Sequence, residues 1–427
     1  MALQVKHMKD FSVERFLYVR GGLMCHTGRM RRLPRASRSA AMRFVILIGI
    51  TSLFADFTYE AARSVNGQFL AALGASATIV GFTAGFGELA GYGLRSVFGW
   101  LADRSGRYWL TAIIGYAINL LAVPALALAG DWPLAAALII AERAGRAMRK
   151  PAVEAMLSAA GTRIGQGWAF GLNEALDQAG ATLGPLVMSL VLLLKGDYRT
   201  GYATLAISAL FALATLLIAR RSFPKPRDLA IPGGIEAKGL RKTYWWYMLA
   251  GGCIAAGFAD FALIGYHFQQ ARIIPADLIP VYYAAAMGVG SVGALVLGRL
   301  FDKSGIKTLL ATFFVSLFFA PLVFLGGAVL AFAGILLWGV GMAAQESLLK
   351  PLLAQILATN KKATAFGLYD TGFGAAWFLG SWLMGYLYSR SVPELVVFSI
   401  AIQVVSLPIF WLAYRQTQGA GSGIIRK

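Results

Sequence analysis

Residues 99–106 read Gly-Trp-Leu-Ala-Asp-Arg-Ser-Gly, and residues 298–305 read Gly-Arg-Leu-Phe-Asp-Lys-Ser-Gly. Three shorter matches follow the same order along the chain: Phe54–Phe57 with Phe258–Phe261, Lys150–Pro151 with Lys350–Pro351, and Ala169–Leu172 with Ala365–Leu368. The offsets between the partners run from 196 to 204 residues. Ordered matches at a nearly constant offset indicate an internal duplication, so we expect two similar halves.

The composition is typical of a membrane protein. Hydrophobic residues make up 58% of the 427 residues, charged residues make up 14%, and the mean hydropathy is +0.65. Apolar runs of about 20 residues recur, the length that crosses a bilayer as a helix, and they lack the alternation of β-barrel strands. We therefore predict an all-α polytopic membrane protein with twelve transmembrane helices, near 43–70, 77–101, 107–129, 133–157, 167–194, 199–219, 244–270, 278–301, 307–329, 331–357, 364–388 and 391–414.

The distribution of positive charge predicts the orientation of these spans. The net charge is +19, and ten Lys and Arg residues lie in the tail up to Arg43. The loops on the other side hold four, at Lys195, Arg199, Arg272 and Arg390. Because cytoplasmic loops of membrane proteins are enriched in Lys and Arg, we expect both termini in the cytoplasm of a multi-pass protein of the bacterial inner membrane. This asymmetry accounts for the charge without nucleic acid as a partner.

A stretch rich in helix breakers divides the chain into two sets of six spans. It contains Pro224, Pro226, Pro232 and a glycine pair at 233–234. The expected domains are a basic cytoplasmic tail (1–42), an N-terminal six-helix bundle (43–219), a cytoplasmic central loop (220–243), a C-terminal six-helix bundle (244–415) and a second cytoplasmic tail (416–427).

Residues 99–107 resemble the GxLaDrxGr loop motif of the major facilitator superfamily, and residues 298–307 are a weaker second copy. The resemblance extends over residues 43–415. It implies two pseudo-symmetric six-helix bundles that rock around a central site by alternating access. It also implies a cytoplasmic latch in the loop motif, although an ordinary basic loop is the alternative. The latch residues would be Gly99, Asp103, Arg104, Gly106, Arg107 and, in the second copy, Asp302.

The fifth predicted span carries Gly180, Gly184 and Pro185, which resemble the GxxxGP part of the motif found in the superfamily's antiporters. The glycine pair that usually follows is replaced by Met188-Ser189. Tight packing of two helices explains the same residues equally well, because glycine lets membrane helices approach closely.

Ionisable side chains at bilayer depth are costly and are therefore candidates for function. Asp56, Glu60 and Arg63 share one helical face, and Asp260 and His267 repeat the outer two positions in the second half. We expect these five residues to form the proton-coupling and substrate pathway; a static ion pair is the alternative. Arg146 of the fourth span is a further candidate, whereas Arg149 is assigned to the inner rim, and Glu174, Asp177 and Asp370 are expected to form an inner gate with the loop-motif arginines.

These features predict a secondary active transporter, proton-coupled and exporting small amphipathic molecules. A proton-coupled symporter that imports an organic anion is the alternative, and a non-transporting sensor is a distant one. We expect a monomer in the lipid bilayer, with a small-molecule substrate and protons as partners and without cofactor or metal. No nucleotide-binding GxxxxGK[ST] motif or HExxH metal motif occurs in the sequence, so an ATP-driven pump or an enzyme is not expected.

Overall fold

The computed structural model describes residues 38–164, 166–224, 242–356 and 362–422. The predicted tail at 1–42 therefore lies largely outside the described residues, as does most of the central loop at 220–243 and the last part of the tail at 416–427. Every regular element in the described residues is helical. The prediction of an all-α protein is thus confirmed.

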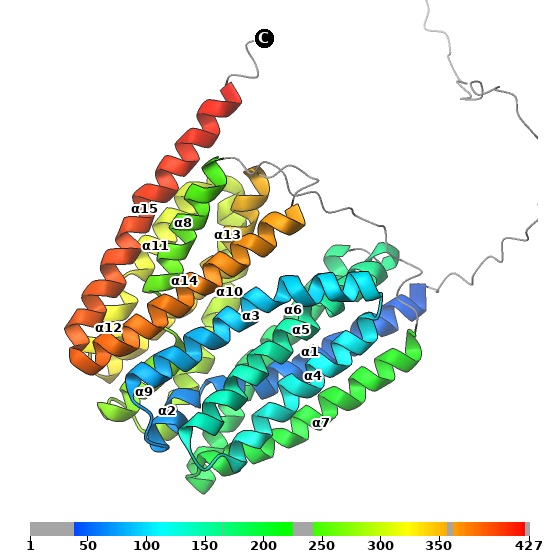
Figure 1. Cartoon of the computed structure of the whole chain (residues 1–427), viewed down its shortest axis with the longest axis horizontal. Helices are drawn as coiled ribbons and strands as arrows, with labels where there is room; N and C mark the ends of the chain where they lie inside the picture. The colour runs from blue at the N-terminus through cyan, green and yellow to red at the C-terminus, as the bar shows by residue number, and fades with distance from the viewer. Residues whose placement is uncertain (1–37, 165, 225–241, 357–361, 423–427) are drawn as a thin grey trace, which may run out of the picture. The chain divides into compact units, whose positions relative to one another are not determined.

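Helices follow one another through both halves (Figure 1). The first half contains α1 (Arg38–Arg63), α2 (Asn66–Ala72), α3 (Ala77–Ser105), α4 (Tyr108–Ala125), η1 (Leu126–Leu128), α5 (Trp132–Ile164), α6 (Gln166–Lys195) and α7 (Tyr198–Ser222). The second half contains α8 (Lys242–Gly257), α9 (Phe261–Gln270), η3 (Ala276–Leu278), α10 (Ile279–Ser304), α11 (Ile306–Ser316), α12 (Phe319–Leu325), α13 (Ala328–Ile356), α14 (Lys362–Arg390) and α15 (Val392–Ser422).

These helices make twelve passes if α1 with α2, α8 with α9, and α11 with α12 each count as one broken span. Within the described residues, nine helical spans are long and apolar enough to cross a membrane. The other three long helices are α3, α5 and α14, of 29, 33 and 29 residues. Charged residues such as Glu88, Arg143 and Asp370 interrupt their apolar runs. The observed helices are consistent with the predicted twelve spans.

The backbone conformation explains why both copies of the loop motif end in glycine. Gly106 ends α3 with φ of +60°, and Gly305 follows α10 with φ of +54°. Side chains are disfavoured at positive φ, so glycine suits a sharp turn between consecutive spans. We name the end of the bundle that carries Ser105 and Ser304 the motif end, and the end that carries Ala72 and Ala271 the opposite end.

The two copies of Phe-Ala-Asp-Phe adopt different structures. Residues 54–57 lie inside the continuous helix α1, whereas residues 258–260 separate α8 from α9. Asp260 is the N-cap of α9, and its Oδ1 accepts a hydrogen bond from the backbone N–H of Ala262 at 3.0 Å. The broken helix therefore places a carboxylate at a helix start inside the membrane, where the cap satisfies an otherwise unpaired amide.

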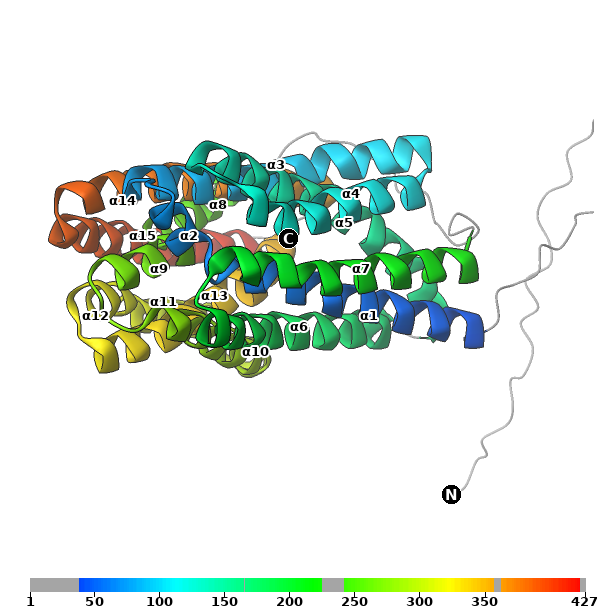
Figure 2. The same cartoon turned by 90° about the horizontal axis from the view of Figure 1, so that it is seen from below.

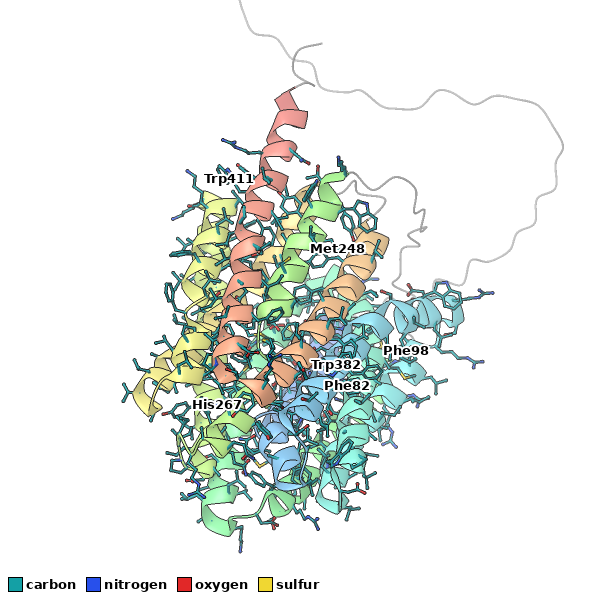
Figure 3. All side chains as sticks on the ribbon, turned by 60° about the vertical axis from the view of Figure 1, so that its left-hand side comes forward. Phe82, Phe98, Met248, His267, Trp382 and Trp411 are labelled. Atoms are coloured by element: carbon teal, nitrogen blue, oxygen red, sulfur yellow. The ribbon has the colours of Figure 1, made fainter. Side chains whose placement is uncertain are left out.

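The halves pack together along α3 and α14, and along α6 and α10 (Figure 1). Phe82 of α3 and Trp382 of α14 lie side by side, with ring centroids 6.0 Å apart (Figure 3). At the opposite end α2 lies against α9 (Figure 2). A Cβ on Gly67 would lie 1.8 Å from the carbonyl oxygen of Ala262, so only glycine permits this approach. The two halves are therefore tightly closed against each other at the opposite end.

Candidate functional site: a buried ion-pair network beside a central cavity

One helical face of α1 meets one face of α5 through ion pairs. Asp56 lies 3.0 Å from Arg149 and 3.6 Å from Arg146, and Glu60 lies 4.0 Å from both Arg146 and Arg63. Asp56, Glu60 and Arg63 occur at a spacing that puts them on the same face of α1. The structure thus brings the three predicted residues of the first span together with the predicted Arg146.

Glu88 of α3 bridges two arginines from different helices. Its Oε1 lies 2.9 Å from Nη1 of Arg143 on α5 and 3.2 Å from Nη2 of Arg63 on α1. Arg143 also lies 3.5 Å from Glu142, which accepts a hydrogen bond from Asn119 of α4. The sequence showed Glu88 as a lone carboxylate, because both of its partners lie on other helices. The only signal for it was its charge within an apolar span.

Two polar contacts of this network cross between the halves. Arg63 Nη2 lies 3.4 Å from Asp260 Oδ2, and the hydroxyl of Tyr283 on α10 donates a hydrogen bond to Glu60. All four side chains are buried. Tyr283 was not predicted, since tyrosine is common in membrane helices and nothing in its local sequence marks it. These contacts tie the network of the first half to the broken span of the second.

Arg149 is the clearest difference from the sequence prediction. We expected it at the inner rim, but it is buried at 6% exposure, stacks over the ring of Tyr116 at 4.5 Å and pairs with Asp56. The helix α5 continues to Ile164, which places residue 149 well inside the bundle. The predicted span ended at residue 157, so Arg149 was expected closer to the end of the helix than it is.

A cavity of about 440 Å³ lies between the halves next to this network. Its inner part is lined by Asp56, Glu60, Arg63 and Arg146 of the first half, with Met287 of the second. Glu88, which contacts Arg63, lines the cavity as well. The rest of its walls carry acidic, basic, polar and aromatic side chains: Tyr92, Arg95, Lys150, Glu174, Asp177, Gln345, Glu346, Tyr369, Asp370, Phe373 and Trp377. The predicted gate residues Glu174, Asp177 and Asp370 therefore line the same cavity as the predicted pathway.

A second cavity of about 350 Å³ lies within the first half, between α1, α5 and α6. Asp56, Arg146, Lys150, Glu174 and Asp177 line both cavities. Asp56 can therefore be reached from either of them.

The loop-motif residues do not make the expected gate pairs with Glu174 and Asp177 in the part of the chain that the structure describes. Asp103 accepts a hydrogen bond from the hydroxyl of Tyr108 at 2.9 Å, and Arg104 lies over the ring of Trp100 at 5.1 Å. Arg107 is exposed, and Glu174 accepts a hydrogen bond from Gln178 at 3.0 Å. A Cβ on Gly99 would lie 3.4 Å from Pro151. The side chain of Asp302 lies outside the described set.

The antiporter-like glycines pack α6 onto the first copy of the repeat. A Cβ on Gly180 would lie 2.2 Å from the carbonyl oxygen of Leu53, and one on Gly184 would lie 2.2 Å from that of Phe57. Pro185 lies inside α6 directly after this contact. The close approach of the two backbones holds α1, and with it Asp56, against α6.

His267 is not among the described residues that line the cavity. Its Nδ1 lies 3.0 Å from the hydroxyl of Tyr388, and its ring lies 5.1 Å from that of Phe324. Figure 3 shows His267 near the opposite end of the second half. His267 matches Arg63 in sequence spacing but does not occupy the corresponding position in the structure. The reason is that the second copy is broken between α8 and α9, whereas α1 is continuous.

Comparisons with known proteins agree with this architecture. The family model described as Major Facilitator Superfamily matches residues 46–381. An uncharacterized protein of Mycobacterium tuberculosis is 38% identical over 376 residues, which cover 86% of this chain and 92% of that protein. An uncharacterized MFS-type transporter of Methanocaldococcus jannaschii is 24% identical over 375 residues, with 85% and 92% covered.

Solved structures show the same fold at low sequence identity. The nucleoside transporter NupG, in a mutant form, superposes with a TM-score of 0.72 at 11% identity and covers 87% of this chain and 100% of its own. A bacterial homologue of the human lysosomal transporter Spinster, inward-facing and unoccupied, has a TM-score of 0.70 at 13% identity, with 89% and 98% covered. By its sequence motifs, its helical architecture and these matches, the chain belongs to the Major Facilitator Superfamily and is a membrane transporter rather than an enzyme.

Proposed function

We propose that this chain is a secondary active transporter that couples the movement of a small amphipathic molecule to protons, in the direction of export. The observation that carries the proposal is the buried network beside the cavity. It contains five carboxylates and four guanidinium groups: Asp56, Glu60, Glu88, Glu142 and Asp260 with Arg63, Arg143, Arg146 and Arg149.

The carboxylate excess supports proton coupling on physical grounds. A buried charge without a partner is costly, and ion pairs are tolerated at bilayer depth when their charges balance. One proton bound to the network neutralises the excess negative charge. Two pairs of the network, Arg63 with Asp260 and Glu60 with Tyr283, join the halves, so protonation of Asp260 or Glu60 weakens these contacts. Proton binding is thereby linked to the relative position of the halves.

The geometry also supports alternating access with the motif end in the cytoplasm. The cavity extends from Arg63 toward Lys150, Glu174 and Asp370, and α2 and α9 close the opposite end. The Spinster homologue described as inward-facing has a similar fold. The positive-inside rule supports a cytoplasmic motif end, and on this orientation a cavity toward the motif end is an inward-facing one.

The alternative, import of an organic anion with protons, is favoured by Arg146. Its ion pairs are among the longest in the network, at 3.6 and 4.0 Å, and it lines the cavity. A guanidinium with loosely held partners can bind a carboxylate or phosphate of a substrate.

Purified protein in liposomes tests the proposal. A pH-sensitive dye inside the liposomes reports proton flux when amphipathic compounds of positive, neutral and negative charge are added outside. We expect at least one compound to drive proton flux that protein-free liposomes and Asp56→Asn liposomes lack. Substrate movement that is independent of any pH gradient would contradict proton coupling, and the direction of the flux distinguishes antiport from symport.

A further inference from the structure

The charge of the cavity is opposite to that of the chain. The whole sequence has 39 Lys and Arg against 20 Asp and Glu. Among the described residues that line the cavity, seven are acidic and four are basic, an excess of three negative charges when all are ionised. We propose that the cavity binds an organic cation, namely a protonated amine joined to a flat apolar body. This assignment rests on the proposed transport function, because it takes the cavity as the substrate site.

The acidic residues toward the motif end come from both halves. Glu174 and Asp177 belong to α6, and Glu346 and Asp370 belong to α13 and α14. A cation that enters between them is attracted from both sides, and low-dielectric walls strengthen this attraction over its value in water. The charge distribution therefore favours entry of a cation and opposes entry of an anion.

The three arginines of the cavity already have negative or aromatic partners. Arg63 lies between Glu88 and Asp260, at 3.2 and 3.4 Å. Arg146 lies 4.2 Å from the ring centroid of Tyr59, and Arg95 lies 4.7 Å from that of Tyr92. An anionic substrate would have to displace these partners. A cationic substrate that binds near Asp177 and Glu346 would leave the ion pairs of Asp56, Glu60 and Glu88 in place.

The second half supplies an aromatic wall. Tyr369, Phe373 and Trp377 follow one another at four-residue intervals along α14, with ring centroids 5.8 Å apart at each step. Tyr92 of α3 completes the wall at 5.6 Å from Phe373. Aromatic faces attract cations and stack against flat apolar groups. The wall thus suits both parts of the proposed ligand.

A buried hydrogen-bond acceptor in the same cavity distinguishes amines from other cations. Gln345 lines the cavity and is 6% exposed, and its Oε1 has no hydrogen-bond partner. Its Nε2 donates to the carbonyl of Gly341 at 3.4 Å, which leaves the amide oxygen as the free atom. A buried acceptor without a donor costs free energy, and an ammonium N–H supplies the missing donor. The indole N–H of Trp377, also without a partner, is a donor for an oxygen on the ligand body.

Three naphthalene probes that share one ring body test this inference. They are 2-(1-naphthyl)ethylammonium, its N,N,N-trimethyl analogue, and 2-(1-naphthyl)acetate, with binding measured by calorimetry on purified protein and corrected for detergent. We expect the primary ammonium to bind at least tenfold more tightly than the acetate. Tighter binding of the acetate would overturn the inference while leaving proton-coupled transport intact, whereas loss of proton flux with normal cation binding would count against the transport proposal alone.

Two variants locate the binding. Gln345→Met should weaken the binding of the primary ammonium about fivefold. The affinity for the trimethyl analogue, which has no N–H, should not change. The matched control is Gln269→Met, because Gln269 is not among the described cavity residues and also has an unpartnered amide oxygen. Glu346→Gln should weaken the binding of both cations. Glu394→Gln changes an exposed ion pair with Arg390 and should leave the binding of both cations unchanged. Equal effects of Gln345→Met on the two cations would contradict the role of the amide oxygen.

Discussion

Arg63 Nη2 of the first half lies 3.4 Å from Asp260 Oδ2 of the second, inside the membrane region. Asp260 is also the N-cap of α9. One carboxylate therefore starts a half-helix and joins the halves. The two roles are separable, because asparagine caps helices about as well as aspartate but carries no charge.

Substitution of Asp260 should give two distinct losses of stability. Asp260→Asn keeps the cap and removes the ion pair, at a cost of about 2 kcal/mol for a hydrogen bond between charged groups. Asp260→Ala removes the cap as well, for about 1 kcal/mol more. Thermal unfolding of the purified variants measures both. Equal stability of the two variants would show that the cap contributes nothing here.

Glu88→Gln should abolish proton-driven transport while substrate exchange at equal pH continues. The amide cannot gain or lose a proton, yet it fits the space between Arg63 and Arg143. Counterflow and pH-driven uptake in the same liposomes separate the two activities. Retention of pH-driven uptake in this variant would remove Glu88 from the coupling network.

Alanine at Gly180 or Gly184 should destabilise the protein by about 1–3 kcal/mol, the usual range for overpacking. The new methyl group would meet the backbone of α1, which cannot move aside as a flexible side chain can. Gly171→Ala on the same helix is the control, because a Cβ there meets nothing within 4 Å. The comparison needs only the thermal unfolding midpoint of each variant. Equal midpoints for all of them would mean that the helices separate readily at this contact.

Alanine at Gly106 should destabilise the turn between α3 and α4 by about 1 kcal/mol, since residue 106 has a φ of +60°. Asn tolerates this conformation better than Ala, so Gly106→Asn should lose less. A larger loss for Asn than for Ala would show that the loop motif needs glycine for space and not for its backbone conformation.

The sequence predicted what depends on local patterns. The lengths of the apolar runs predicted the membrane spans. The spacing of Asp56, Glu60 and Arg63 predicted that they lie on one face of a helix. The network could not be predicted in full, because Glu88 and Tyr283 gain their roles from contacts between helices far apart in the chain. The repeat also misled at one point: His267 matched Arg63 in sequence, but the break before α9 places it against Tyr388.

Protons that bind to this network should change which end of the molecule is open. Spin labels on cysteines at Ala72 and Ala271 report the opposite end, and labels at Ser105 and Ser304 report the motif end; all four positions are exposed. Cys25 and Cys253 are replaced beforehand. Protonation of Glu60 or Asp260 weakens their bonds to Tyr283 and Arg63, which join the halves, so low pH should loosen the closure of the opposite end.

Pulsed electron–electron distance measurements at pH 5 and pH 8 make the test. We predict that acidification lengthens the distance between residues 72 and 271 and shortens that between residues 105 and 304, and that Glu88→Gln reduces both changes. Distances that stay the same at both pH values in the unsubstituted network would contradict the account.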